Sequence, residues 1–79
     1  MTWVDYIIKA FRNLGGEANY DELYEELSRL KGKALTTTQQ ATVRKEIERK
    51  SSDSDNYDRT EDLFYSCGNG SGRWGLRRR

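Results

Sequence analysis

The sequence predicts an α+β fold in which three helices precede a C-terminal β-hairpin. Apolar residues recur at helical spacing in three segments of the first fifty residues. Each of those segments begins with a residue pattern typical of a helix N-cap. The last third of the chain instead holds two short aromatic segments around a glycine-rich turn. A length of 79 residues suits a single domain over 1–79.

The first helix is predicted over about 3–14. Thr2 is its expected N-cap, and the acidic Asp5 three residues later fits a capping box. The apolar positions on one face of this helix are Trp3, Val4, Ile7, Ile8, Phe11 and Leu14. Gly15 and Gly16 should end the helix, because glycine adopts the left-handed conformation of a C-cap at little cost.

The second helix is predicted over about 20–31, after a short link at 17–19 that could form a brief strand. Asn19 and Glu22 fit a capping box at its start, and Gly32 should stop it. Its expected buried stripe consists of Tyr20, Leu23, Tyr24, Leu27 and Leu30. Its opposite face is acidic and carries Asp21, Glu22, Glu25 and Glu26.

The third helix is predicted over about 37–50, with Thr37 and Gln40 as its capping box. Val43 and Ile47 should face the core. At about 100° per residue, the opposite direction is occupied by a polar stripe of Thr38, Thr42, Lys45 and Arg49. Arg44 lies on the flank of the buried stripe. It either contacts a partner or folds back to pair with Asp53 or Asp55 in the following loop.

The closing third contains a polar loop over 51–60 and a predicted wing over about 62–77. The residues 63–66 have the composition of a strand, 68–72 form a turn, and 73–77 pair back. With a side-chain period of two, Trp74 and Leu76 share one face, and Arg73, Gly75 and Arg77 share the other. We expect the apolar face to cover the helices. The expected aromatic core residues are Trp3, Phe11, Phe64 and Trp74.

Three helices followed by a basic hairpin are the layout of a winged helix–turn–helix, which makes double-stranded DNA the first partner to consider. The net charge is only +1, but residues 33–50 hold five basic and two acidic residues, and 64–79 hold four basic residues. Such a chain can bind a polyanion with one face. The predicted DNA contacts are Thr38, Thr42, Arg44, Lys45, Arg49, Arg73 and Arg77.

Each of these contacts also has a purely structural interpretation. The polar stripe of the third helix could be an ordinary solvated face, and Arg73 and Arg77 could protect a sheet edge from aggregation. Arg78 and Arg79 could add a basic tail. A second hypothesis is a protein-interaction module, in which the acidic face of the second helix meets a basic partner.

No catalytic set, metal site or cofactor motif is predicted. The chain has no histidine and one cysteine, Cys67, so the usual pair of nucleophile and base is missing. The loop around Asp58 departs from an EF-hand, and the glycines of the turn lack dinucleotide-binding spacing. We expect an intracellular, cytoplasmic monomer, because the sequence contains no secretory signal, no long apolar run and no spare apolar stripe.

Several residues together resemble the HARE-type winged helix–turn–helix. They are Thr2-Trp3, Phe11, Gly16, Tyr20-x-x-Leu23, the strand Leu63-Phe64-Tyr65 and the closing Gly72-x-Trp74-Gly75-Leu76-Arg77. The second half is most similar to modules found beside nuclease domains in bacterial restriction systems, through Val43-Arg44, Ser51-Ser52-Asp53-Ser54, Tyr57, Asp62-Leu63-Phe64 and the same closing segment. The resemblance implies DNA binding or the sensing of modified DNA, in transcription regulation or restriction–modification, with a nuclease or another protein as partner. No nuclease domain is present in these 79 residues.

Overall fold

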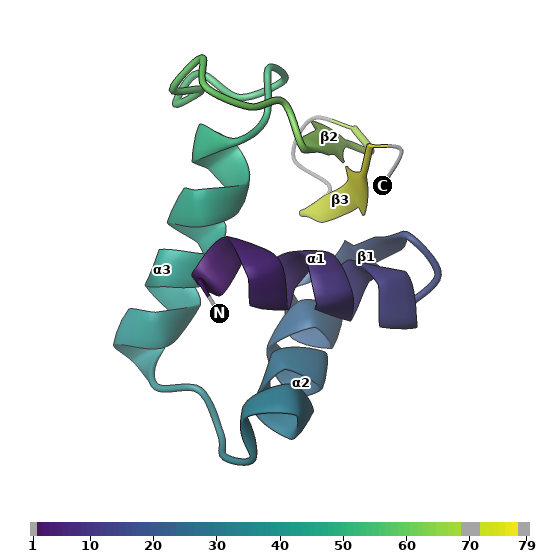
Figure 1. The fold of residues 1–79 in the computed structure, drawn as a ribbon, viewed down its shortest axis with the longest axis vertical. Helices are drawn as coiled ribbons and strands as arrows, with labels where there is room; N and C mark the ends of the chain where they lie inside the picture. The colour runs from purple at the N-terminus through teal and green to yellow at the C-terminus, as the bar shows by residue number, and fades with distance from the viewer. Residues whose placement is uncertain (1, 69–71, 78–79) are drawn as a thin grey trace.

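The structure, a computed structural model, describes residues 2–68 and 72–77. In these residues three helices and a three-stranded antiparallel sheet are present, so the predicted α+β class is confirmed (Figure 1). The elements in chain order are α1 (Trp3–Asn13), β1 (Glu17–Asn19), α2 (Tyr20–Lys31), α3 (Thr37–Arg49), β2 (Phe64–Ser66) and β3 (Arg73–Leu76). In Figure 1, α1 crosses in front of α2 and α3, and the loop after α3 leads to the sheet.

Each of these helices begins with a capping box, in which two side chains satisfy backbone N–H groups at the helix start. The Thr2–Asp5 and Asn19–Glu22 boxes are those predicted. The third prediction was wrong by one residue, because Thr36 is the N-cap and pairs with Gln39. The segment Thr36-Thr37-Thr38-Gln39-Gln40 offers two consecutive capping boxes, and the local pattern does not distinguish them.

The helix ends agree with the predictions to within one residue, which is the usual fraying of a helix end. α1 stops at Asn13, and α3 stops at Arg49 with Lys50 as its C-cap. Gly32 adopts a left-handed conformation, with φ of 79°, and caps α2 as expected. In the predicted turn, residues 69–71 lie outside the described part of the chain.

The sheet has the order β1-β3-β2, so the last strand lies between the first two. The short strand expected at 17–19 is present and pairs antiparallel with β3, with Ala18 opposite Trp74. On the other side, Ser66 of β2 is also opposite Trp74. β3 therefore joins the connection between α1 and α2 to the end of the chain.

The core lies between the helices and the inner face of this sheet. Its buried apolar side chains are Ile7, Ala10, Phe11, Ala18, Leu23, Leu27, Val43, Ile47, Leu63 and Phe64. The rings of Phe11 and Phe64 lie 5.3 Å apart between centroids, which ties α1 to β2. Trp3 and Trp74 are only partly buried and pack against the core from its edge, so the core prediction holds fully for the two phenylalanines.

Candidate nucleic-acid interface

The outer face of α3 is the part of the predicted interface that remains most open. Val43 and Ile47 are fully buried and hold the helix against the core, as expected. On the opposite side, Thr38 and Lys45 are exposed, together with Ala41 between them. Small side chains on an uncovered helix face allow close approach of a large partner. Thr42 is half-buried, and its hydroxyl donates a hydrogen bond to the Thr38 carbonyl at 3.1 Å.

Lys45 is the predicted cation with the least intramolecular restraint. Its side chain is exposed and makes no hydrogen bond or ion pair with any residue of 2–68 or 72–77. The same holds for Lys33, an exposed residue in the turn between α2 and α3. Sequence reasoning missed Lys33, because a single charge in a turn belongs to no periodic pattern. No acidic residue occurs between Lys33 and Lys45, so this segment is electropositive.

Arg44 links α3 to α2 instead of holding the loop. Its guanidinium donates a hydrogen bond to the Tyr24 hydroxyl at 2.9 Å, and this bond raises the pKa of Arg44. The predicted alternative, a pair with Asp53 or Asp55, is wrong, because Arg44 leaves the helix on the side of α2 and Asp53 is bound by Arg77. The Arg44 side chain is nevertheless exposed.

Arg49 is fixed at the C-terminal end of α3 by two carboxylates. One terminal guanidinium nitrogen of Arg49 lies 3.4 Å from a carboxylate oxygen of Glu46. The other lies 3.6 Å from a carboxylate oxygen of Asp58 in the following loop. Asp58 also contacts Lys50 at 3.2 Å. Hydrogen bonds from Thr60, assisted by Lys50, lower the pKa of Asp58 to about 2. Arg49 is therefore part of a network that connects the helix end to the loop, and it would have to exchange a carboxylate for a phosphate to contact DNA.

Arg73 lies on the outer face of the sheet, as its position in β3 predicts. It pairs with Glu17 at 3.6 Å and with Glu22 at 3.4 Å. The Arg73 side chain is 44% exposed and both carboxylates are similarly open, so these pairs are surface ion pairs. Surface pairs stabilise a fold by about 0–1 kcal/mol and exchange readily with other anions. These two pairs could therefore be exchanged for a phosphate at little cost.

Arg77 has the structural role that was considered for Arg44. Its Nε lies 3.0 Å from Asp62 and also donates to the Phe64 carbonyl at 3.0 Å. Its terminal nitrogen lies 3.2 Å from Asp53. With these acceptors on the loop and on β2, Arg77 braces the segment between α3 and the sheet. Arg78 and Arg79, the expected basic tail, lie outside the described residues.

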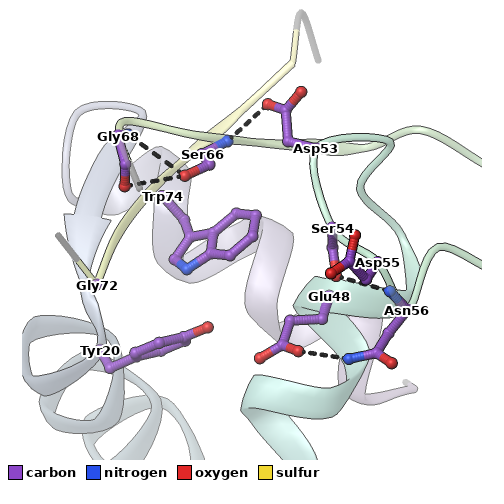
Figure 2. A pocket seen from close by; sticks show the side chains of 10 residues that line it. All are labelled: Tyr20, Glu48, Asp53, Ser54, Asp55, Asn56, Ser66, Gly68, Gly72 and Trp74. Atoms are coloured by element: carbon purple, nitrogen blue, oxygen red, sulfur yellow. Dashed lines mark hydrogen bonds between the residues drawn. The ribbon is translucent and has the colours of Figure 1, made fainter. Parts of the chain in front are cut away.

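A pocket of about 340 Å³ opens between α2, α3 and β3 (Figure 2). Its lining is acidic, whereas the outer face of α3 is basic. Tyr20 of α2 and Trp74 of β3 form one wall, and Glu48 of α3 lies across from them. Asp53 and Asp55 of the loop complete the acidic part of its lining, beside the neutral amide of Asn56. These carboxylates repel phosphate, so an approaching polyanion would be directed toward the segment that ends at Lys45.

The acidic face of α2 is present as predicted and borders a second pocket, of about 490 Å³. Glu22 and Glu25 are exposed there, beside Leu14. Glu26 is already compensated, because it accepts hydrogen bonds from Arg29 and from Asn13, and both lower its pKa. Glu22 is also engaged, by the Asn19 N–H and by Arg73, so the negative charge available to a partner on this face comes mainly from Asp21 and Glu25.

Comparisons with protein-family models, curated proteins and solved structures gave no match to this chain. Within residues 2–68 and 72–77, no group of three or more His, Cys, Asp or Glu is arranged to hold a metal ion. None of the helices in that part of the chain has both the length and the apolar character needed to cross a bilayer.

Proposed function

We propose that this chain is a non-catalytic winged helix–turn–helix module that binds double-stranded DNA through the outer face of α3. The observation that carries the proposal is the uncovered side of α3, where Thr38, Ala41 and Lys45 are exposed and Arg44 lies alongside. A helix anchored on one side and open on the other can enter the major groove, which is about 12 Å wide. The hairpin of β2 and β3 would act as the wing.

The predicted contacts differ in how readily they could act. Lys45 is available without any rearrangement, and Arg44 would keep its charge if it left Tyr24. Arg49 and Arg73 would exchange surface ion pairs for phosphates. Arg77 would contribute least, because it would have to release the loop. Thr38 and Thr42 would contact phosphate or base edges through their hydroxyls.

The electrostatic test is the salt dependence of binding to a short duplex. About three phosphate contacts, from Arg44, Lys45 and one exchanged arginine, predict a slope of about −3 for log affinity against log salt. Fluorescence anisotropy of a labelled duplex between about 50 and 200 mM salt measures this slope. A flat response, or no binding at the lowest salt, would overturn the proposal.

A matched pair of variants separates a docked α3 from nonspecific attraction. Lys45→Glu should reduce affinity at least about tenfold and make the salt slope shallower by about 1 to 2. Lys9→Glu is the control, because Lys9 is also an exposed lysine without a partner in the described residues, but it lies on α1. Equal losses in the two variants would show that binding does not use α3.

The second candidate is a protein-interaction module that binds a basic partner through the acidic face of α2. The specific observation in its favour is the pocket where Glu22 and Glu25 border Leu14, since it combines charge with an apolar surface. Amide NMR during a titration with duplex DNA distinguishes the two functions. Shifts confined to 33–50 and to 72–77 favour DNA, and a silent titration favours the protein partner.

A further inference from the structure

The pocket between α2, α3 and β3 has two walls of different chemistry (Figure 2). One wall consists of the rings of Tyr20 and Trp74, which are both only partly buried. The other wall carries Glu48 near the end of α3 and Asp55 in the following loop. Aromatic rings and carboxylates on facing walls form a surface that attracts cations, because a ring face and a carboxylate are both electronegative.

Part of this negative charge is not compensated within the fold. Asp53 is paired with Arg77 at 3.2 Å and also accepts the Ser66 N–H at 2.9 Å. Asp55, in contrast, has no hydrogen bond or ion pair with any described residue. Glu48 accepts one hydrogen bond, from the neutral amide of Asn56 at 2.8 Å, and Arg44, one turn earlier on α3, offsets part of its charge electrostatically without an ion pair. No Lys or Arg is found among the described residues that line the pocket.

The pKa of Tyr20 reflects both the burial of its hydroxyl and the charges around the pocket. Burial raises the pKa of Tyr20 to about 12, and the Glu48 carboxylate contributes to the rise, whereas a hydrogen bond with Trp74 and the charge of Arg44 oppose it. The Tyr20 hydroxyl therefore stays neutral at physiological pH. Burial by itself disfavours any charge here, and only the contribution of Glu48 reflects a negative potential that favours a cation.

We propose that the pocket formed by Tyr20, Trp74, Glu48 and Asp55 binds the ammonium group of a lysine side chain presented by a protein partner. A volume of about 340 Å³ is enough for one such side chain. The aliphatic stem would pack on the ring of Trp74, and the ammonium would donate hydrogen bonds to Glu48 and Asp55. The site uses a different flank of α3 from Lys45, although Arg44, a proposed DNA contact, is close enough to Glu48 and Tyr20 to interact with both electrostatically.

The chain offers a direct probe of this site. It contains two tryptophans, so its NMR spectrum should show two indole N–H signals, and Trp3 lies outside the pocket. The titrants are a blocked Gly-Lys-Gly peptide and the same peptide with uncharged norleucine in place of lysine. The lysine peptide should shift the Trp74 signal with a Kd on the order of millimolar, and the Trp3 signal should stay in place. The norleucine peptide should leave the indole N–H signals of both Trp3 and Trp74 unchanged.

Charge removal on the pocket wall gives the second measurement. The variant with Glu48→Gln and Asp55→Asn should weaken lysine binding about tenfold without loss of the folded spectrum. Its matched control is Glu25→Gln with Asp21→Asn, which removes two charges from the exposed face of α2. Equal weakening in both variants would overturn the proposal, because binding would then follow net charge only.

Two further outcomes would also overturn it. A norleucine peptide that shifts Trp74 as strongly as the lysine peptide would show an apolar site. Free n-butylammonium that binds more tightly than the peptide would assign the pocket to small amines instead of a protein. Neither result bears on DNA binding, which is measured on the wild-type chain with duplex alone.

Discussion

The guanidinium of Arg77 connects the end of β3 to the loop that follows α3, with Nε 3.0 Å from Asp62 and a terminal nitrogen 3.2 Å from Asp53. Asp62 is also bonded by the backbone N–H of Ser52 at 2.9 Å. A single planar side chain thus holds both ends of a loop that has few apolar anchors. Only an arginine can donate in several directions with this fixed geometry.

The first prediction concerns this brace. Arg77→Met should lower the free energy of unfolding by about 1–3 kcal/mol, because two carboxylates lose a charged donor. Urea denaturation at neutral pH measures the change. Arg12→Met is the control, since Arg12 is exposed on α1 and has no partner in the described residues. If Arg77→Met lowers the free energy of unfolding no more than Arg12→Met does, Arg77 does not support the loop.

The second prediction is acid sensitivity. The pKa of Asp58 is lowered to about 2, chiefly by Thr60, and that of Asp62 is lowered by Ser52 and Arg77. A depressed pKa means that the unfolded chain binds more protons between the unfolded and folded pKa values. These carboxylates therefore stabilise the fold above about pH 4, and that stabilisation is lost as the pH falls toward 2.

Thermal melts between pH 7 and pH 2 test this prediction. Asp58→Asn should melt below the wild type at pH 7, and the two curves should converge near pH 2 because the titrating group is gone. Asp21→Asn changes an exposed carboxylate without a partner in the described residues. Its melting temperature should fall between pH 7 and pH 2 by as much as that of the wild type. Parallel curves for Asp58→Asn and the wild type would contradict the assignment.

The third prediction concerns the glycine opposite Tyr65. A Cβ at Gly75 would lie 2.5 Å from the Tyr65 hydroxyl oxygen and would collide with the ring that crosses β3. The Tyr65 hydroxyl donates to Glu17 at 2.6 Å, so the ring cannot move without losing this bond. Gly75→Ala should destabilise the fold by about 1–3 kcal/mol.

A double-mutant cycle tests the cause of that loss. In a Tyr65→Ala background the added methyl group has room, so Gly75→Ala should cost much less than in the wild type. The free energies of unfolding of the two single variants, the double variant and the wild type provide the coupling energy. An unchanged cost would mean that backbone conformation, and not the Tyr65 ring, requires glycine here.

The fourth prediction links the ion pairs to the proposed function. Glu46→Gln removes a carboxylate 3.4 Å from Arg49 and should raise affinity for duplex DNA about two- to fivefold, because Arg49 then exchanges only its pair with Asp58 for a phosphate. Glu25→Gln makes the same net charge change on the exposed face of α2 and serves as the control. If both variants gain equally, Arg49 does not contact the duplex.

How far the sequence predicted the candidate interface depends on the residue. The exposure of Thr38 and Lys45 followed from helical periodicity, because the direction of a side chain on a helix is a local property. The partners of Arg77 could not be predicted, since Asp53 and Asp62 lie 24 and 15 positions away in the chain. The register of the third capping box was also undetermined, because two neighbouring patterns compete for it. DNA binding stays a prediction.

The sequence by itself determined the order of the elements, their limits to within a residue, and most of the large side chains that face the core, but not the burial of Ala10, Ala18 and Leu63. These features follow from periodicity, capping and glycine conformation, which act over a few neighbouring positions. Only the tertiary structure decided which arginines are occupied by carboxylates and that Tyr20, Glu48 and Trp74 share one pocket. The physical reason is the return of β3 between β1 and β2, which brings together residues from opposite ends of the chain.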